Sequence, residues 1–106
     1  MAFVAQPDTW IANWSEDGVD ISVPLATFTE LTAAEADGTT GDIRKLLFAI
    51  CYELFESWNG KATADRPSNM TISKSTLVDN PNATLTHTFS FKFVCEIGAQ
   101  EVKDES

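Results

Sequence analysis

The side chains most often used in catalysis are few in this 106-residue chain, and they are widely spaced. His87 is the only histidine, and Cys51 and Cys95 are the only cysteines. A thiol beside a base can act as a nucleophile, so a Cys51–His87 dyad is the chemistry to consider first. However, Cys51 lies in a helical pattern and His87 lies on the apolar side of an alternating stretch, and nothing in the sequence brings them together. We therefore expect two free, buried thiols and a hydrogen-bonded histidine, with no catalytic residue.

The sequence also lacks the residue spacings that are typical of metal and cofactor sites. One histidine and two cysteines far apart in the chain do not make a zinc pattern. The stretches "SEDGVD" and "DGTTGD" place carboxylates beside glycines, but neither has the ligand spacing of a calcium loop, so solvated turns are expected. Trp10, Trp14 and Trp58 could stack on a sugar or a base, although aromatic residues in an apolar context usually belong to a core or an interface. The sequence predicts neither a metal nor a cofactor.

The charge balance argues against two classes of partner. Seven basic residues face sixteen acidic ones, which gives a net charge of −9. Binding to nucleic acid depends on Lys and Arg neutralising phosphates, and attraction to an anionic membrane needs the same residues, so we expect neither. No apolar run approaches the ~20 residues that cross a bilayer, and the opening "MAFVAQPDTW" has no feature of a signal peptide. The expected location is the cytoplasm, without secretion by a signal peptide.

The clearest element is a helix over residues 41–58. Its apolar residues recur at helical spacing, and aromatic residues widen the apolar arc to roughly two-thirds of the circumference. The apolar positions are Ile43, Leu46, Leu47, Ile50, Leu54 and Trp58, with Phe48, Cys51, Tyr52 and Phe55 along one flank. The exposed side is expected to hold Lys45, Ala49, Glu53, Glu56 and Ser57. Asn59-Gly60 predicts a left-handed stop, and Thr32 with Glu35 predicts a capping box before a short helical turn that ends by Gly38.

Two hairpins are expected on either side of this helix. The stretch "LTHTFSFKFVCEI" alternates apolar and polar residues over positions 85–97, and "DNPNA" turns it back on residues 70–78. Residues 9–14 ("TWIANW") and 19–25 are expected to form the first hairpin around the glycine of "SEDG". The order hairpin–helix–hairpin predicts an α+β fold, in which an antiparallel sheet of about four strands has one main helix packed on one face. We expect a single domain over residues 1–106, with a frayed acidic tail at 98–106.

One helix is too small to cover such a sheet. A 13-residue strand is about 44 Å long and four strands are nearly 20 Å wide, whereas the helix is about 27 Å by 10 Å. Phe3 and Val4 would cover part of the remainder. We therefore expect a homo-oligomer, because uncovered apolar surface usually marks an interface. The predicted interface consists of Phe48, Tyr52, Phe55, Phe89, Phe91 and Phe93.

Three alternatives stay open at this stage. The strand could bend so that its ends pack on the loops of a monomer. The uncovered sheet face could serve as the pocket of a small-ligand-binding domain. A cysteine-dependent enzyme is the third reading, after a structural or assembly module and a ligand-binding domain.

Three stretches carry a resemblance to a known group of proteins. They are "LTAAEADGTTGDIRKLLFAICYELFESW", "TADRPSNMTISKST" and "THTFSFKF", which together cover roughly residues 25–95. They resemble small, acidic, uncharacterised proteins encoded by marine bacteriophages and found in ocean metagenomes. The resemblance implies a virion-associated or assembly protein that forms part of a ring or lattice, with other virion proteins as partners and the virion as a second location. It implies no catalytic residues.

Overall fold

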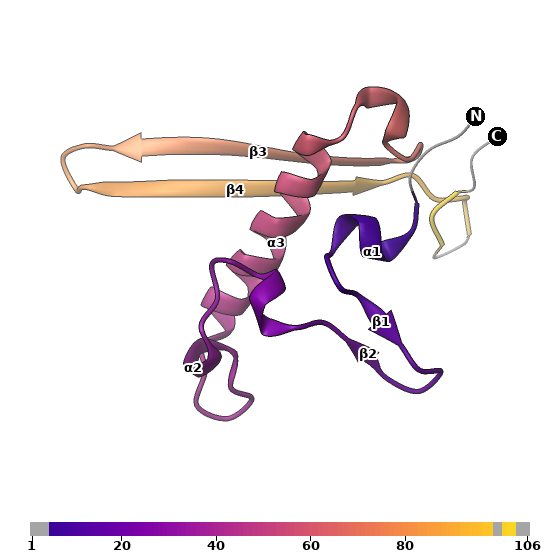
Figure 1. Ribbon diagram of the computed structural model, residues 1–106. Coiled ribbons are helices and arrows are strands. Elements are labelled where there is room, and N and C mark those ends of the chain that lie inside the picture. The colour runs from indigo at the N-terminus through magenta and orange to yellow at the C-terminus, as the bar shows by residue number, and fades with distance from the viewer. Residues whose placement is uncertain (1–4, 99–100, 104–106) are drawn as a thin grey trace. The chain divides into compact units, whose positions relative to one another are not determined.

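The structure is a computed structural model that describes residues 5–98 and 101–103. Phe3 and Val4, which were expected to cover part of the sheet, and most of the expected frayed tail lie outside the described residues. The chain divides into two compact units, Met1–Arg66 and Pro67–Ser106. The first unit contains the helices and a small hairpin, and the second contains a long hairpin (Figure 1). An α+β fold with antiparallel strands and one main helix is confirmed.

The first unit begins with a helical turn and a very short hairpin. Helix α1 spans Pro7–Trp10, with proline at its start, where the ring's fixed φ suits a helix. Strands β1 (Ser15–Glu16) and β2 (Ile21–Ser22) pair antiparallel. The Asp17 carboxylate accepts the backbone N–H groups of Val19 and Asp20 at 2.9 and 2.7 Å, and Gly18 has a φ of 90°. The turn at "SEDG" is therefore as expected, although its strands are much shorter.

The single sheet of about four strands is wrong, because the described residues form two separate two-stranded sheets. Trp10 belongs to α1, and Asn13 adopts a φ of 62°, which lies outside the β region. Pro24 then lacks a backbone donor and precedes a 3₁₀ turn, η1, at Leu25–Thr27. The first hairpin thus keeps two residue pairs, Ser15 with Ser22 and Glu16 with Ile21.

Two helices follow, each with a polar cap. Helix α2 spans Ala33–Ala36, and the reciprocal Thr32–Glu35 capping box is confirmed. Helix α3 spans Ile43–Gly60, and the Asp42 carboxylate caps it by accepting the Arg44 N–H at 3.0 Å.

The left-handed stop at Asn59-Gly60 is wrong. Gly60 is the last residue of α3, and Lys61 follows with a φ of −93°. The Trp58 carbonyl accepts both the Lys61 N–H and the Arg66 Nε, at 3.2 and 3.1 Å. These donors satisfy an end carbonyl of the helix, so no left-handed residue is needed there. A 3₁₀ turn, η2, at Thr63–Asp65 completes the unit.

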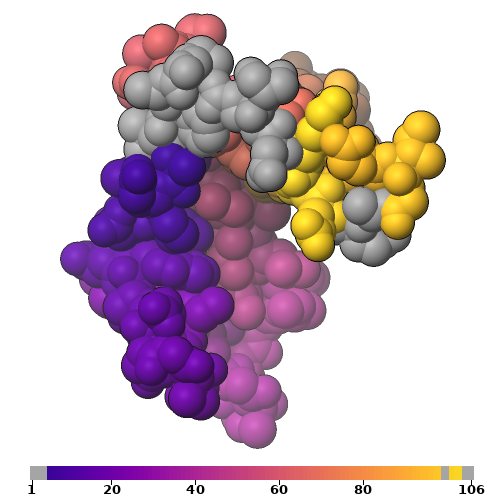
Figure 2. All heavy atoms as spheres, turned by 90° about the vertical axis from the view of Figure 1, so that its right-hand side faces the viewer, coloured from indigo at the N-terminus to yellow at the C-terminus, as the bar shows by residue number. Residues whose placement is uncertain are grey.

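Part of the side of α3 that was expected to face solvent contacts the N-terminal segment, residues 5–14, although Lys45 and Glu56 are exposed as expected. Ala49 is 1% exposed, and the Ser57 hydroxyl donates to the Trp10 carbonyl. Figure 2 shows this segment, in indigo, lying alongside the helix. Ala49 and Ser57 lie two turns apart on one side of α3, and small side chains allow a neighbouring backbone to come close. Conversely, Ile43 and Leu47 are exposed although they belong to the predicted apolar arc.

The second unit is a ten-pair antiparallel hairpin. Strand β3 (Met70–Asp79) pairs with β4 (Thr84–Phe93) in the register that joins Met70 to Phe93 and Asp79 to Thr84. The turn between them contains Ala83 with a φ of 52°. One side of this hairpin, which we call the apolar face, holds Met70, Ile72, Lys74, Thr76 and Val78 of β3 and Leu85, His87, Phe89, Phe91 and Phe93 of β4.

Strand β4 ends four residues earlier than expected. Its partner begins at Met70, and Asn69 turns away with a φ of 62°, so the ladder cannot continue beyond the bond from the Val94 N–H to the Asn69 carbonyl. Cys95 then forms an isolated bridge with Val102 and is exposed, which corrects the expected burial of this thiol.

Candidate functional site

The exposed apolar residues of the long hairpin gather at its two ends. Val78 and Leu85 face each other across the strands near the turn, and Leu85 is 53% exposed. Phe93, at the opposite end of β4, is 51% exposed. Strand β4 therefore has an exposed apolar side chain at each end of the same face.

The middle of the apolar face is more sheltered. Ile72 is buried, and Phe89 and Phe91 are half-buried. The His87 ring lies 6.4 Å from the Phe89 ring, and its Nδ1 is 3.2 Å from the Thr76 hydroxyl, with which it shares a hydrogen bond. This partner gives His87 a structural role on the strand.

The six residues predicted as an interface fall into two groups. Phe48, Tyr52 and Phe55 are half-buried on α3, where the rings of Phe48 and Tyr52 stack at 5.8 Å. Phe89, Phe91 and Phe93 share the apolar face of the hairpin, and only Phe93 is exposed. The exposed residues Val78 and Leu85 were not predicted as part of the interface. Their cross-strand pairing could have been deduced from the turn, because closing it with Asp79 and Thr84 places Val78 opposite Leu85.

Charge is distributed unevenly between the two units. Met1–Arg66 contains eleven acidic and four basic residues, which is a net −7 of the total −9. Residues 67–98 contain two acidic residues, Asp79 and Glu96, and two basic ones, Lys74 and Lys92. The apolar face thus belongs to a charge-balanced hairpin within an otherwise strongly acidic chain.

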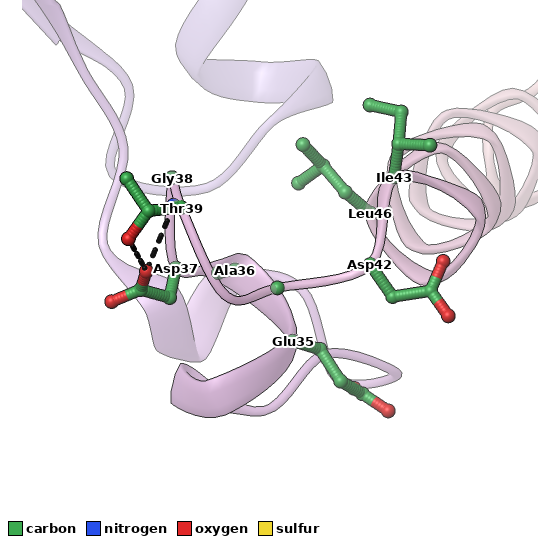
Figure 3. Close-up of a pocket in the computed structure, with 9 residues that line it drawn as sticks. Glu35, Ala36, Asp37, Gly38, Thr39, Asp42, Ile43 and Leu46 are labelled. Atoms are coloured by element: carbon green, nitrogen blue, oxygen red, sulfur yellow. Dashed lines mark hydrogen bonds between the residues drawn. The ribbon is translucent and has the colours of Figure 1, made fainter.

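A shallow cavity of about 330 Å³ lies between the α2–α3 loop and the start of α3 (Figure 3). The Asp37 carboxylate accepts the Thr39 N–H and the Thr40 N–H at 2.9 Å each, and also the Thr39 hydroxyl at 3.0 Å. These donors hold the pKa of Asp37 well below its usual range. A Cβ on Gly41 would collide with the Glu35 and Asp37 carbonyls, so the loop needs glycine there. The loop satisfies its own carboxylate and works as a rigid connection.

The cap of α3 is expected to make the fold sensitive to acid. Hydrogen bonds from the Arg44 side chain and backbone lower the pKa of Asp42 from 3.8 to about 2. The charged form is thus favoured in the folded state, and its stabilisation is present above pH ~4 and lost as the pH falls towards 2. Asp42→Asn should lower the urea midpoint at pH 6, measured by far-UV circular dichroism, and match the unsubstituted chain near pH 2. The control Asp20→Asn, in the β1–β2 turn, should show no such convergence; equal convergence would contradict the assignment.

The two cysteines belong to different units of the chain. Cys51 is half-buried on α3, and burial raises the pKa of its thiol, which makes it a poor nucleophile. His87 and Cys95 lie in the other unit. Among residues 5–98 and 101–103, no cluster of histidine, cysteine, aspartate or glutamate could hold a metal ion.

Comparisons with protein-family models, curated proteins and solved structures find no match to this chain. Within the described part of the chain, no helix combines the length and the apolar character needed to cross a membrane.

Proposed function

We propose that this chain is a non-enzymatic structural module that self-associates through the apolar face of the β3–β4 hairpin. The observation that carries the proposal is the exposure of Leu85 and Phe93, one at each end of this face on strand β4. Fully burying a side chain of this size contributes ~1.5–3 kcal/mol, so a contact that covers both of their exposed halves is worth a few kcal/mol.

The hairpin itself also favours a partner. Two-stranded hairpins are at best marginally stable in water and usually gain stability from further strands or from packing on an apolar face. Because residues 67–98 carry no net charge, the hairpin itself adds no net repulsion between copies. The aromatic flank formed by Phe48, Tyr52 and Phe55 belongs to that acidic unit and is half-buried, so it is the weaker part of the predicted interface.

The resemblance to bacteriophage proteins suggests where such a module works. We propose a virion or its assembly intermediate, in which many copies of one small chain form a ring or lattice and other virion proteins are the neighbours. The acidic Met1–Arg66 unit would then face the solvent or basic partners.

Light scattering behind a sizing column tests self-association directly. The 11.6 kDa chain is expected to elute as a multimer at micromolar concentration and to dissociate on dilution. A chain that stays monomeric over the whole accessible concentration range would refute the proposal.

A further inference from the structure

The backbone of β4 offers a specific way for two copies to join. In the part of the chain that the structure describes, β3 and β4 pair only with each other, so both are edge strands of their sheet. Edge strands carry a row of backbone donors and acceptors that point away from the sheet, and these readily pair with another chain.

The alternation of hydrogen-bonded and non-hydrogen-bonded pairs along β3 and β4 shows which residues of β4 direct their backbone N–H and C=O groups away from β3. The Val94 N–H donates to the Asn69 carbonyl in continuation of the β3–β4 register. In an antiparallel ladder, hydrogen-bonded and non-hydrogen-bonded pairs alternate. Counting from Asn69–Val94, the even-numbered residues of β4 bond to β3, and the odd-numbered ones direct their N–H and C=O groups to the outer edge. The outward residues are Leu85, His87, Phe89, Phe91 and Phe93, which are also the β4 residues of the apolar face.

We propose that β4 pairs antiparallel with β4 of a second copy about a two-fold axis at Phe89, which joins the two hairpins into a four-stranded sheet. This inference rests on the proposed self-association and specifies its geometry. The axis places Phe89 opposite its own copy, His87 opposite Phe91 and Leu85 opposite Phe93. The exposed side chains at the two ends of β4 thus meet each other twice, once at each end of the new seam.

Charge and the exposed apolar side chains together favour β4 over β3 for this role. Strand β4 contains no acidic residue, and its one lysine, Lys92, would lie opposite Thr86 on the polar face. A pairing of two β3 strands centred on Lys74 would place this lysine directly opposite its own copy, and the equally overlapping register centred on Ser75 would place the exposed Val78 opposite the buried Ile72. Like charges at opposing positions destabilise a strand pair.

Proline substitutions on the two edges test the pairing. His87→Pro removes an outward N–H of β4 but no donor of the β3–β4 ladder. Thr76→Pro is a matched control, because Thr76 lies directly opposite His87, points to the outer edge of β3 and loses the same Thr76–His87 side-chain hydrogen bond. We expect His87→Pro to be monomeric in light scattering at concentrations where Thr76→Pro keeps the mass of the unsubstituted protein.

Each other outcome has a definite meaning. If both variants stay multimeric, or if Thr76→Pro dissociates, the β4 seam is wrong although self-association stands. If the unsubstituted chain is monomeric, the proposed function fails as well.

Crosslinking tests the register without a proline. On a Cys51→Ala, Cys95→Ser background, Thr88→Cys and Ser90→Cys chains are mixed and oxidised. Thr88 of one copy lies opposite Ser90 of the other in a non-hydrogen-bonded pair, whose short Cα separation suits a disulfide. The mixture should form on the order of ten times more disulfide dimer than either variant alone, and equal yields would overturn the Phe89-centred register.

Discussion

Replacing Trp10 with alanine is expected to lower the free energy of unfolding of the first unit by ~3–5 kcal/mol. Trp10 is only 7% exposed, and its ring lies 6.1 Å from that of Trp58 on α3. The Lys61 ammonium lies 4.2 Å from the centre of the Trp10 ring, and it also donates to the Thr9 carbonyl at 2.7 Å. Removing the indole thus opens the contact that joins α1 to α3.

Urea unfolding followed by far-UV circular dichroism measures this effect, because α3 contributes most of the helix. Trp14→Ala is the control, since Trp14 is also a tryptophan of the N-terminal segment but is only half-buried. The midpoint of Trp10→Ala should fall much further than that of Trp14→Ala. Equal losses would mean that the N-terminal segment is held by its overall apolar content and not by the Trp10–Trp58 contact.

Local chemistry made several elements predictable. The Thr32–Glu35 capping box depends on residues three positions apart, and the structure contains both of its hydrogen bonds. The alternation in residues 85–93 depends only on the two-residue period of a strand, and the register confirms that Leu85, His87, Phe89, Phe91 and Phe93 share one face. Both of these predictions depend on neighbours in sequence and are confirmed, whereas the left-handed stop at Asn59-Gly60 is wrong although it also used neighbouring residues.

The features that could not be predicted depend on contacts between residues far apart in the sequence. Ala49 was placed on the exposed side of α3 by hydropathy, yet it is only 1% exposed, and its small side chain allows close packing at this position. The spacing of Trp10 and Trp14 fits a strand or a helix equally well, and the contact with Trp58 accompanies a helical turn. The spacing of apolar residues alone does not show which side of a helix or strand will pack against another part of the chain.

The ends of the strands could not be predicted from the local sequence pattern either. Apolar alternation continues through Cys95 and Ile97, but a strand extends only as far as its partner, and Asn69 ends β3 with a positive φ. The first hairpin is limited in the same way by Asn13 and Pro24. The register therefore shows that Phe89, Phe91 and Phe93 share one face of β4, and that the exposed apolar residues of this face lie at the two ends of the strand.

Replacing Leu85 with glutamate is expected to weaken self-association on the order of 100-fold. In the proposed two-fold pairing each subunit contributes one Leu85, so the change would remove two apolar contacts with Phe93 and place a carboxylate against each phenyl ring. A loss of ~1–1.5 kcal/mol at each of two sites gives this factor. Leu77→Glu is the matched control, because Leu77 is 69% exposed on the same hairpin but lies on the opposite, polar face. Both variants add the same charge to a similarly exposed leucine. In a dilution series by light scattering, Leu85→Glu should dissociate at about 100-fold higher concentration than Leu77→Glu, and coincident curves would exclude the apolar face as the seam.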